Sequence, residues 1–201
     1  NFALGVSIAP QDGNTICSIA STIHSTSSGT LKGDMKFYTN SGDNLDERLR
    51  IDSSGFVGLD NTSPNSSLAG ARNLVIGSGS GDKGLTIMSG TSGVGHIEFS
   101  DGTGSSAAKT AGGIRYYHNS NYMRFNTNGG TERMRIDSSG RLMVGTTTEG
   151  FATYGDKFTI ANSGHCGMTI RSGTSSDGNI YFSDGTSGAD EVRGFVEYNH
   201  S

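Results

Sequence analysis

Apolar and polar residues alternate along short stretches of the chain, and turn-forming residues separate these stretches. In "RMRID" (133–137), Met134 and Ile136 take one set of alternate positions and charged residues take the other, as in a half-buried strand. The turn "DSSG" follows, with an Asp that can accept a backbone hydrogen bond from two residues on and a Gly at the fourth position. The chain returns as "RLMVG", with Leu142 and Val144 in phase. We predict a β-hairpin with these four apolar residues on its core face. If the charged face is solvated, truncating its arginines should cost little.

The same phrase occurs earlier in the chain. "ERLRIDSSGFVGLDNT" (47–62) parallels "ERMRIDSSGRLMVGTT" (132–147), and "MKFYTNSG" (35–42) parallels "MRFNTNGG" (123–130). The earlier copy therefore predicts a second hairpin of the same kind. Its core-face residues are Leu49, Ile51, Val57 and Leu59.

A third match extends the repeat toward the end of the chain. "GLTIMSGTSGVGHIEFSDGT" (84–103) aligns with "GMTIRSGTSSDGNIYFSDGT" (167–186). The matches divide the chain into three units, and a fixed period over several copies is typical of an array. The units span residues 1–66, 67–150 and 151–201, the last one truncated.

Further strands are expected inside each unit. "LTIMS" (85–89) and "HIEFS" (96–100) read as one strand pair, and "GIRYY" (113–117) and "YMRFN" (122–126) as a hairpin around "HNSN". No helical stripe of useful length occurs. The predicted fold class is all-β, an elongated array of hairpin and meander repeats with about six short strands per unit.

Composition limits how such a unit can be stable. Only 32% of the 201 residues are hydrophobic, 32 are glycine, and none is Trp. Burial of one Leu or Ile contributes about 1.5–3 kcal/mol, whereas ordering one residue costs about 1–2 kcal/mol. A unit this poor in large apolar residues needs a shared core. Identical chains wound around a common axis would supply one, as an intertwined homotrimer resembling a β-prism or β-helix.

Several classes of function find no support in the sequence. The net charge of −4 offers nothing to nucleic acid, and no apolar stretch is long enough to span a membrane. The serine motif G-x-S-x-G is absent, and the paired carboxylates Asp46 and Glu47 lie where the two copies differ in length. The adjacent His165 and Cys166 would point to opposite faces of a strand. We expect no enzyme activity and no cofactor or metal, although one His per chain on a threefold axis remains open.

The longest repeated stretches carry a family resemblance. "GGIRYYHNSNYMRFNTNGGTERMRIDSSGRLMVGTT" (112–147) and "GDMKFYTNSGDNLDERLRIDSSGFVGLDNTSP" (33–64) resemble repeats in tail fibres of tailed bacteriophages, notably those of marine cyanobacteria. "ERxRIDSSG" is the most specific part. Asp60 and Met143 stand where glycine is usual. The resemblance implies a homotrimeric, β-rich shaft in the virion tail, without catalytic residues.

Three functions follow from these observations. The first is a structural shaft segment of a tail fibre that presents a host-adsorption tip, with other virion tail proteins as partners. The second is a glycan-binding module in which the loop "GTSGVG" (90–95) or the aromatic hairpin contacts host polysaccharide, and the third is a depolymerase stalk. The aromatic candidates are Tyr116, Tyr117 and Tyr122. They do not recur in every unit, which favours the shaft.

The two ends of the sequence suggest a longer protein. The chain has no initiator Met, and Ser201 matches Ser120, which lies inside a predicted hairpin turn. We expect the natural chain to continue with the missing strand and further domains.

Overall fold

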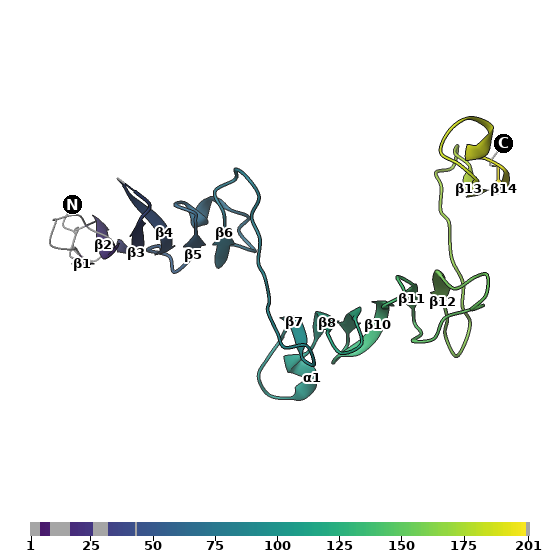
Figure 1. Cartoon of the computed structure of the whole chain (residues 1–201), viewed down its shortest axis with the longest axis horizontal. Helices are drawn as coiled ribbons and strands as arrows, with labels where there is room; N and C mark the ends of the chain where they lie inside the picture. Colours follow the sequence, from purple (N-terminus) through teal and green to yellow (C-terminus); the bar gives the residue numbers. More distant parts are fainter. Residues whose placement is uncertain (1–4, 9–16, 26–31, 43, 200–201) are drawn as a thin grey trace. The chain divides into compact units, whose positions relative to one another are not determined.

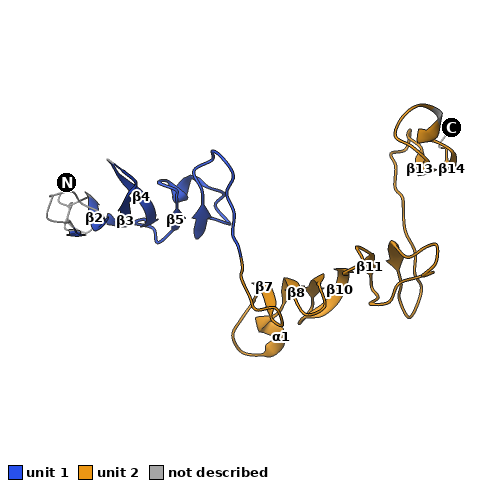
Figure 2. Ribbon diagram, in the orientation of Figure 1, with its two compact units in different colours: residues 1–86 blue, residues 87–201 orange. Residues whose placement is uncertain are grey.

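The computed structural model describes residues 5–8, 17–25, 32–42 and 44–199 of the chain. Within them, strands dominate and the helices are single turns, so the all-β prediction is confirmed (Figure 1). The helical turns are α1 (Ser106–Lys109), η1 (Pro64–Ser66) and η2 (Gly188–Glu191). None of the helices in the described part has the length and apolarity needed to cross a membrane. The chain divides into two compact units, 1–86 and 87–201 (Figure 2).

The first unit holds one six-stranded sheet whose strands lie in sequence order. Neighbouring strands are antiparallel until the last pair, β5 and β6, which is parallel. The strands are β1 (Gly5–Ile8), β2 (Cys17–Ser25), β3 (Lys32–Asn40), β4 (Leu45–Ile51), β5 (Val57–Leu59) and β6 (Leu74–Ile76). The predicted hairpin of residues 47–62 is β4 and β5. It pairs Ile51 with Val57 and Leu49 with Leu59.

The second unit builds a sheet of the same size, order and pairing senses. Its strands are β7 (Val94–Phe99), β8 (Gly112–Tyr117), β9 (Tyr122–Thr127), β10 (Thr131–Ile136), β11 (Leu142–Val144) and β12 (Phe158–Ile160). Both hairpins predicted here are present, as β8–β9 and β10–β11. The matched phrases thus occupy corresponding strands, and the sheets end at Ile76 and Ile160. These positions differ from the ends of the sequence units because a repeat can be divided at any phase.

One predicted strand pair is wrong. Residues 85–89 form no strand, and β7 pairs with β8 instead, placing Ile97 opposite Ile114. The corresponding later strands, β13 (Gly178–Phe182) and β14 (Gly194–Tyr198), pair in the same way as a two-stranded sheet. The sequence favoured the wrong partner because it lay closer along the chain, whereas the true partner lies across the α1 loop. Residues 200–201, including the expected truncation point, lie outside the described residues.

The "DSSG" turns have the predicted chemistry. Asp137 Oδ1 accepts hydrogen bonds from the backbone N–H groups of Ser139 at 2.9 Å and Arg141 at 3.0 Å. Gly140 takes a φ of 70°, a left-handed conformation that glycine adopts without a Cβ clash. The earlier copy repeats this geometry around Asp52, whose Oδ1 accepts from Ser54 at 2.8 Å. Each turn therefore fixes the register of the hairpin that it closes.

A β-bulge near the start of β10 changes which residues share a face. Glu132 lies opposite Asn126 and Met134 lies opposite Phe125, so Arg133 is an extra residue in the ladder. The extra residue puts Glu132, rather than Arg133, on the same side as Arg135. Simple alternation predicted Arg133 there, and that prediction is wrong. The sheet of the first unit has the same bulge in β4.

The two departures from the repeat's usual glycines are both accommodated. Asp60 has a φ of 50°, where the second copy has Gly145 with a φ of 73°. Met143 is 1% exposed and is the one buried large hydrophobic residue in the described part of the chain. Its counterpart Gly58 has no room for a side chain, because a Cβ there would lie 2.2 Å from the carbonyl oxygen of Asn61. The described residues of neither unit form a hydrophobic core of ordinary size.

Candidate functional site

The principal surface feature of the second unit is a continuous apolar face on its sheet. Ile136 lies opposite Leu142 on one side and Met123 on the other, and β12 extends this row with Phe158. A second row joins Ile97, Ile114, Phe125, Met134, Val144 and Ile160. The four predicted core residues of this hairpin therefore lie on one face, as expected. The described residues leave this face partly uncovered, since Ile136 is 42% exposed and Phe158 is 53% exposed.

The sheet of the first unit carries a matching apolar face. Ile51 lies between Met35 and Val57, and Leu49 lies between Phe37 and Leu59. Parallel pairing adds the two apolar ends of β6, Leu74 and Ile76. Here too the predicted core residues gather on one side, and Ile51 remains 39% exposed. Each sheet therefore presents two rows of aliphatic and aromatic side chains that a second surface could cover.

The opposite face of the second sheet is charged but mostly shielded from solvent. Arg115, Arg124 and Arg135 lie side by side on three neighbouring strands. Arg135 Nη2 donates to Glu132 Oε2 at 2.9 Å, and its guanidinium lies 4.3 Å from the centre of the Tyr122 ring. Truncating the arginines of this face is expected to cost little only if the face is solvated. That condition is not met at Arg135, whose side chain is 17% exposed.

Ion pairing shifts the titration of these groups in a consistent direction. The hydrogen bond to Glu132 raises the pKa of Arg135 above its usual value. Arg115 donates to Glu98, and this hydrogen bond lowers the pKa of the Glu98 carboxyl. These hydrogen bonds thus favour the ionised forms of Arg135 and Glu98.

The first unit repeats the core of this arrangement. Arg50 Nη2 donates to Glu47 Oε2 at 2.8 Å, and its Nη1 lies 3.3 Å from Asp34 Oδ2. The sequence predicts that Asp46 and Glu47 lie in a loop of variable length. That placement is wrong, because both residues belong to strand β4. Asp46 pairs with Arg48 at 2.9 Å. Both carboxylates thus form ion pairs with arginines of their own strand.

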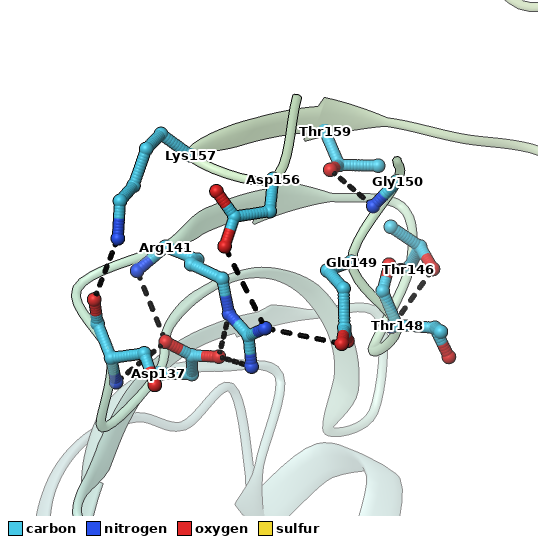
Figure 3. Close-up of polar contacts among 10 residues, drawn as sticks. Asp137, Arg141, Thr146, Thr148, Glu149, Gly150, Asp156, Lys157 and Thr159 are labelled. Atoms are coloured by element: carbon cyan, nitrogen blue, oxygen red, sulfur yellow. Dashed lines mark hydrogen bonds and ion pairs between the residues drawn. The ribbon is translucent and has the colours of Figure 1, made fainter. Parts of the chain in front are cut away.

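A group of polar contacts made by Arg141 and Lys157, here called the Arg141 clamp, lies where the chain crosses from β11 to β12 (Figure 3). Arg141 Nη2 contacts Asp137 Oδ2 at 2.6 Å, and Nη1 contacts Glu149 Oε1 at 3.1 Å. Lys157 donates to the carbonyl of Ser139 at 3.3 Å. The clamp holds the crossover loop against the hairpin turn and so fixes the parallel strand. No short motif marks it, because its members are spread over 21 positions (137–157).

The first unit solves the same problem with different residues. Phe56 occupies the position of Arg141, and the guanidinium of Arg72 lies 4.5 Å from the centre of its ring. Arg72 also donates to the carbonyl of Asn65 at 3.1 Å. The two sheets thus attach the crossover through different contacts, an ion pair in the second and a cation–π contact in the first.

The three tyrosines proposed for glycan contact do not form one platform. Tyr117 and Tyr122 stack at 4.6 Å on the charged face, where the guanidinium of Arg124 covers Tyr117 at 4.8 Å. Tyr116 lies in the apolar row of Met123 and packs edge-on against His118. The hairpin thus divides these rings between two faces, and packing contacts account for all three.

Thiol and metal-binding chemistry are the remaining candidates for a functional site. Cys17 and Cys166 are both free thiols. Over the described ranges, no group of three or more His, Cys, Asp or Glu side chains is placed to hold a metal ion. The surface best suited to a function is therefore the apolar face of each sheet, which can bind another surface but carries no reactive group.

Comparison with known proteins adds no family to this picture. No family model and no curated protein matches the chain.

Proposed function

We propose that the chain is a structural shaft segment of a bacteriophage tail fibre, assembled as a homotrimer in the virion. In this arrangement the repeats form an elongated array, and three copies cover one another's apolar faces. The assembly gives reach and stiffness to a host-adsorption tip. Other tail proteins of the virion are its remaining partners.

The scarcity of buried hydrophobic residues carries this proposal. Among the described residues, Met143 is the one buried large hydrophobic side chain. The free energy gained by burying so little apolar surface cannot offset the conformational entropy lost when the chain folds. Two apolar faces of the same design, presented by two sheets of the same topology, are what a stacked and shared core requires. The resemblance of "ERMRIDSSG" (132–140) to tail-fibre repeats supplies the biological setting.

Light scattering and electron microscopy test the proposal. The purified chain should have the mass of three copies and appear as a slender rod. In virions, a labelled antibody against the chain should bind along the tail appendages. A stable monomer that unfolds cooperatively would refute the shared core, and antibody binding away from the tail would refute the virion role.

A further inference from the structure

Two matching segments of the chain have apolar side chains and an unpaired backbone. "LTIMS" (85–89) lies in the connection between β6 and β7, and "MTIRS" (168–172) lies between β12 and β13 (Figure 1). Within the described residues, neither segment belongs to a sheet or makes a backbone hydrogen bond. Leu85 is 68% exposed and Met88 is 91% exposed. Peptide groups flanked by apolar side chains are costly to leave without partners once water is displaced.

Each segment lines a hollow together with the sheet that follows it; the first hollow is mostly apolar, and the second also contains Arg171 and Glu197. Ile87 borders a hollow of about 230 Å³ whose walls include Ile97, Ile114, Tyr116 and Met123. In the next repeat, Ile170 borders a hollow of about 490 Å³ together with Ile180 and Tyr198. The second hollow is the larger one, and its sheet has two strands where the other has six. The same combination of unpaired backbone segment and adjacent hollow thus occurs twice.

The exposed fractions of apolar side chains on the strands that follow these segments indicate what must be covered. In β7, Phe99 is 62% exposed, and in β13 and β14 Phe182 is 59% exposed and Val196 is 61% exposed. Exposed apolar surface of this kind marks a site of association with another protein surface.

The spacing of the segments identifies the partner. Equivalent residues such as Ile87 and Ile170 are 83 positions apart, and each is followed by the same sheet edge. A second copy of this chain, aligned in parallel, presents its hollows and strand edges at this same spacing. An unrelated partner would need to reproduce that spacing independently. Residues 85–89 carry no charged side chain, and residues 168–172 carry one, Arg171.

We propose that residues 85–89 and 168–172 are β-strands completed by a neighbouring copy of the chain. Each segment adds to a sheet edge of that neighbour, with backbone hydrogen bonds between chains and Ile87 or Ile170 buried at the junction. The inference rests on the proposed homo-oligomeric shaft and specifies which segments join its subunits.

Hydrogen exchange on the assembled full-length chain gives the first test. Amides of residues 85–89 and 168–172 should exchange at least about 100-fold more slowly than in unstructured peptides, although no backbone acceptor among the described residues bonds to them. Light scattering on the same sample reports the number of copies. An oligomer in which these amides exchange freely overturns this inference and leaves the shaft proposal standing, whereas a monomer overturns both.

Cross-linking separates a neighbouring copy from the chain's own units. A photo-reactive residue replaces Met88 in a co-assembled mixture of ¹⁴N- and ¹⁵N-labelled chains. Cross-links that join the two isotopes support the inference, and cross-links confined to single chains overturn it. Ile87→Asp should abolish assembly, whereas Leu68→Asp, at an exposed position outside both segments, should retain it. Equal effects of the two substitutions would also overturn it.

Discussion

Arg135→Ala should destabilise the protein far more than Arg133→Ala, although the two arginines are two positions apart in β10. Arg135 makes a two-pronged contact with Glu132 and lies 4.3 Å from the centre of the Tyr122 ring. Arg133 is exposed and donates one hydrogen bond, from Nε to Thr127 Oγ1 at 3.1 Å. Both substitutions remove the same atoms from the same strand, so the comparison isolates the environment.

The expected magnitude follows from the contacts that are lost. A hydrogen bond to a charged group contributes about 1.5–3 kcal/mol, and a cation–π contact contributes about 0.5–1 kcal/mol at partly exposed sites. Glu132 keeps a weaker partner, because Arg124 Nη1 lies 3.5 Å away, so the carboxylate is not left alone. We expect Arg135→Ala to lower the free energy of unfolding by about 2–4 kcal/mol. Arg133→Ala should lower it by about 0.5 kcal/mol or less.

Urea denaturation followed by circular dichroism measures both values. Protein concentration must be the same throughout, because the stability of an oligomer depends on it. A double-mutant cycle with Glu132→Gln should give a coupling energy of at least about 1 kcal/mol for the pair of Glu132 and Arg135. Equal losses for the two arginine variants would mean that the charged face is solvated and that the bulge does not pair Glu132 with Arg135.

Three further outcomes are expected. The folded-state pKa of Glu98 is held below its usual value of 4.5. Its contribution to the free energy of unfolding is therefore present above pH 4.5 and is lost as the pH falls through the folded-state pKa. In a plot of stability against pH, Glu98→Gln should reduce this loss at acid pH. Gly140→Ala should cost about 1–2 kcal/mol because its φ is 70°, whereas Gly104→Ala, in open space at an ordinary φ, should be near neutral in thermal melts. Ile136→Asp should break the assembly in light scattering, whereas Ser138→Asp in the nearby turn should not; an intact Ile136→Asp oligomer would remove the apolar face from the interface.

The sequence by itself determined the local architecture of the chain. Alternation placed Ile51 opposite Val57 and Ile136 opposite Leu142 on apolar faces, and the "DSSG" phrase defined the turn between them. These features were readable because strand alternation and turn geometry depend on residues within a few positions of one another. The doubled phrase "ERxRIDSSG" likewise indicated that the two hairpins are the same structure.

Only the tertiary structure decided which strands meet and what lies on the charged face. It paired β7 with β8 and left residues 85–89 without a strand partner among the residues that the structure describes. It joined β11 to β12 through the Arg141 clamp, and it used an extra residue in β10 to bring Glu132 beside Arg135. Each of these depends on contacts between distant parts of the chain, and a single inserted residue reverses every face beyond it. Strand pairing and the face that each side chain occupies are fixed only when the sheet assembles. The register of the strands and the burial of their side chains then depend on each other.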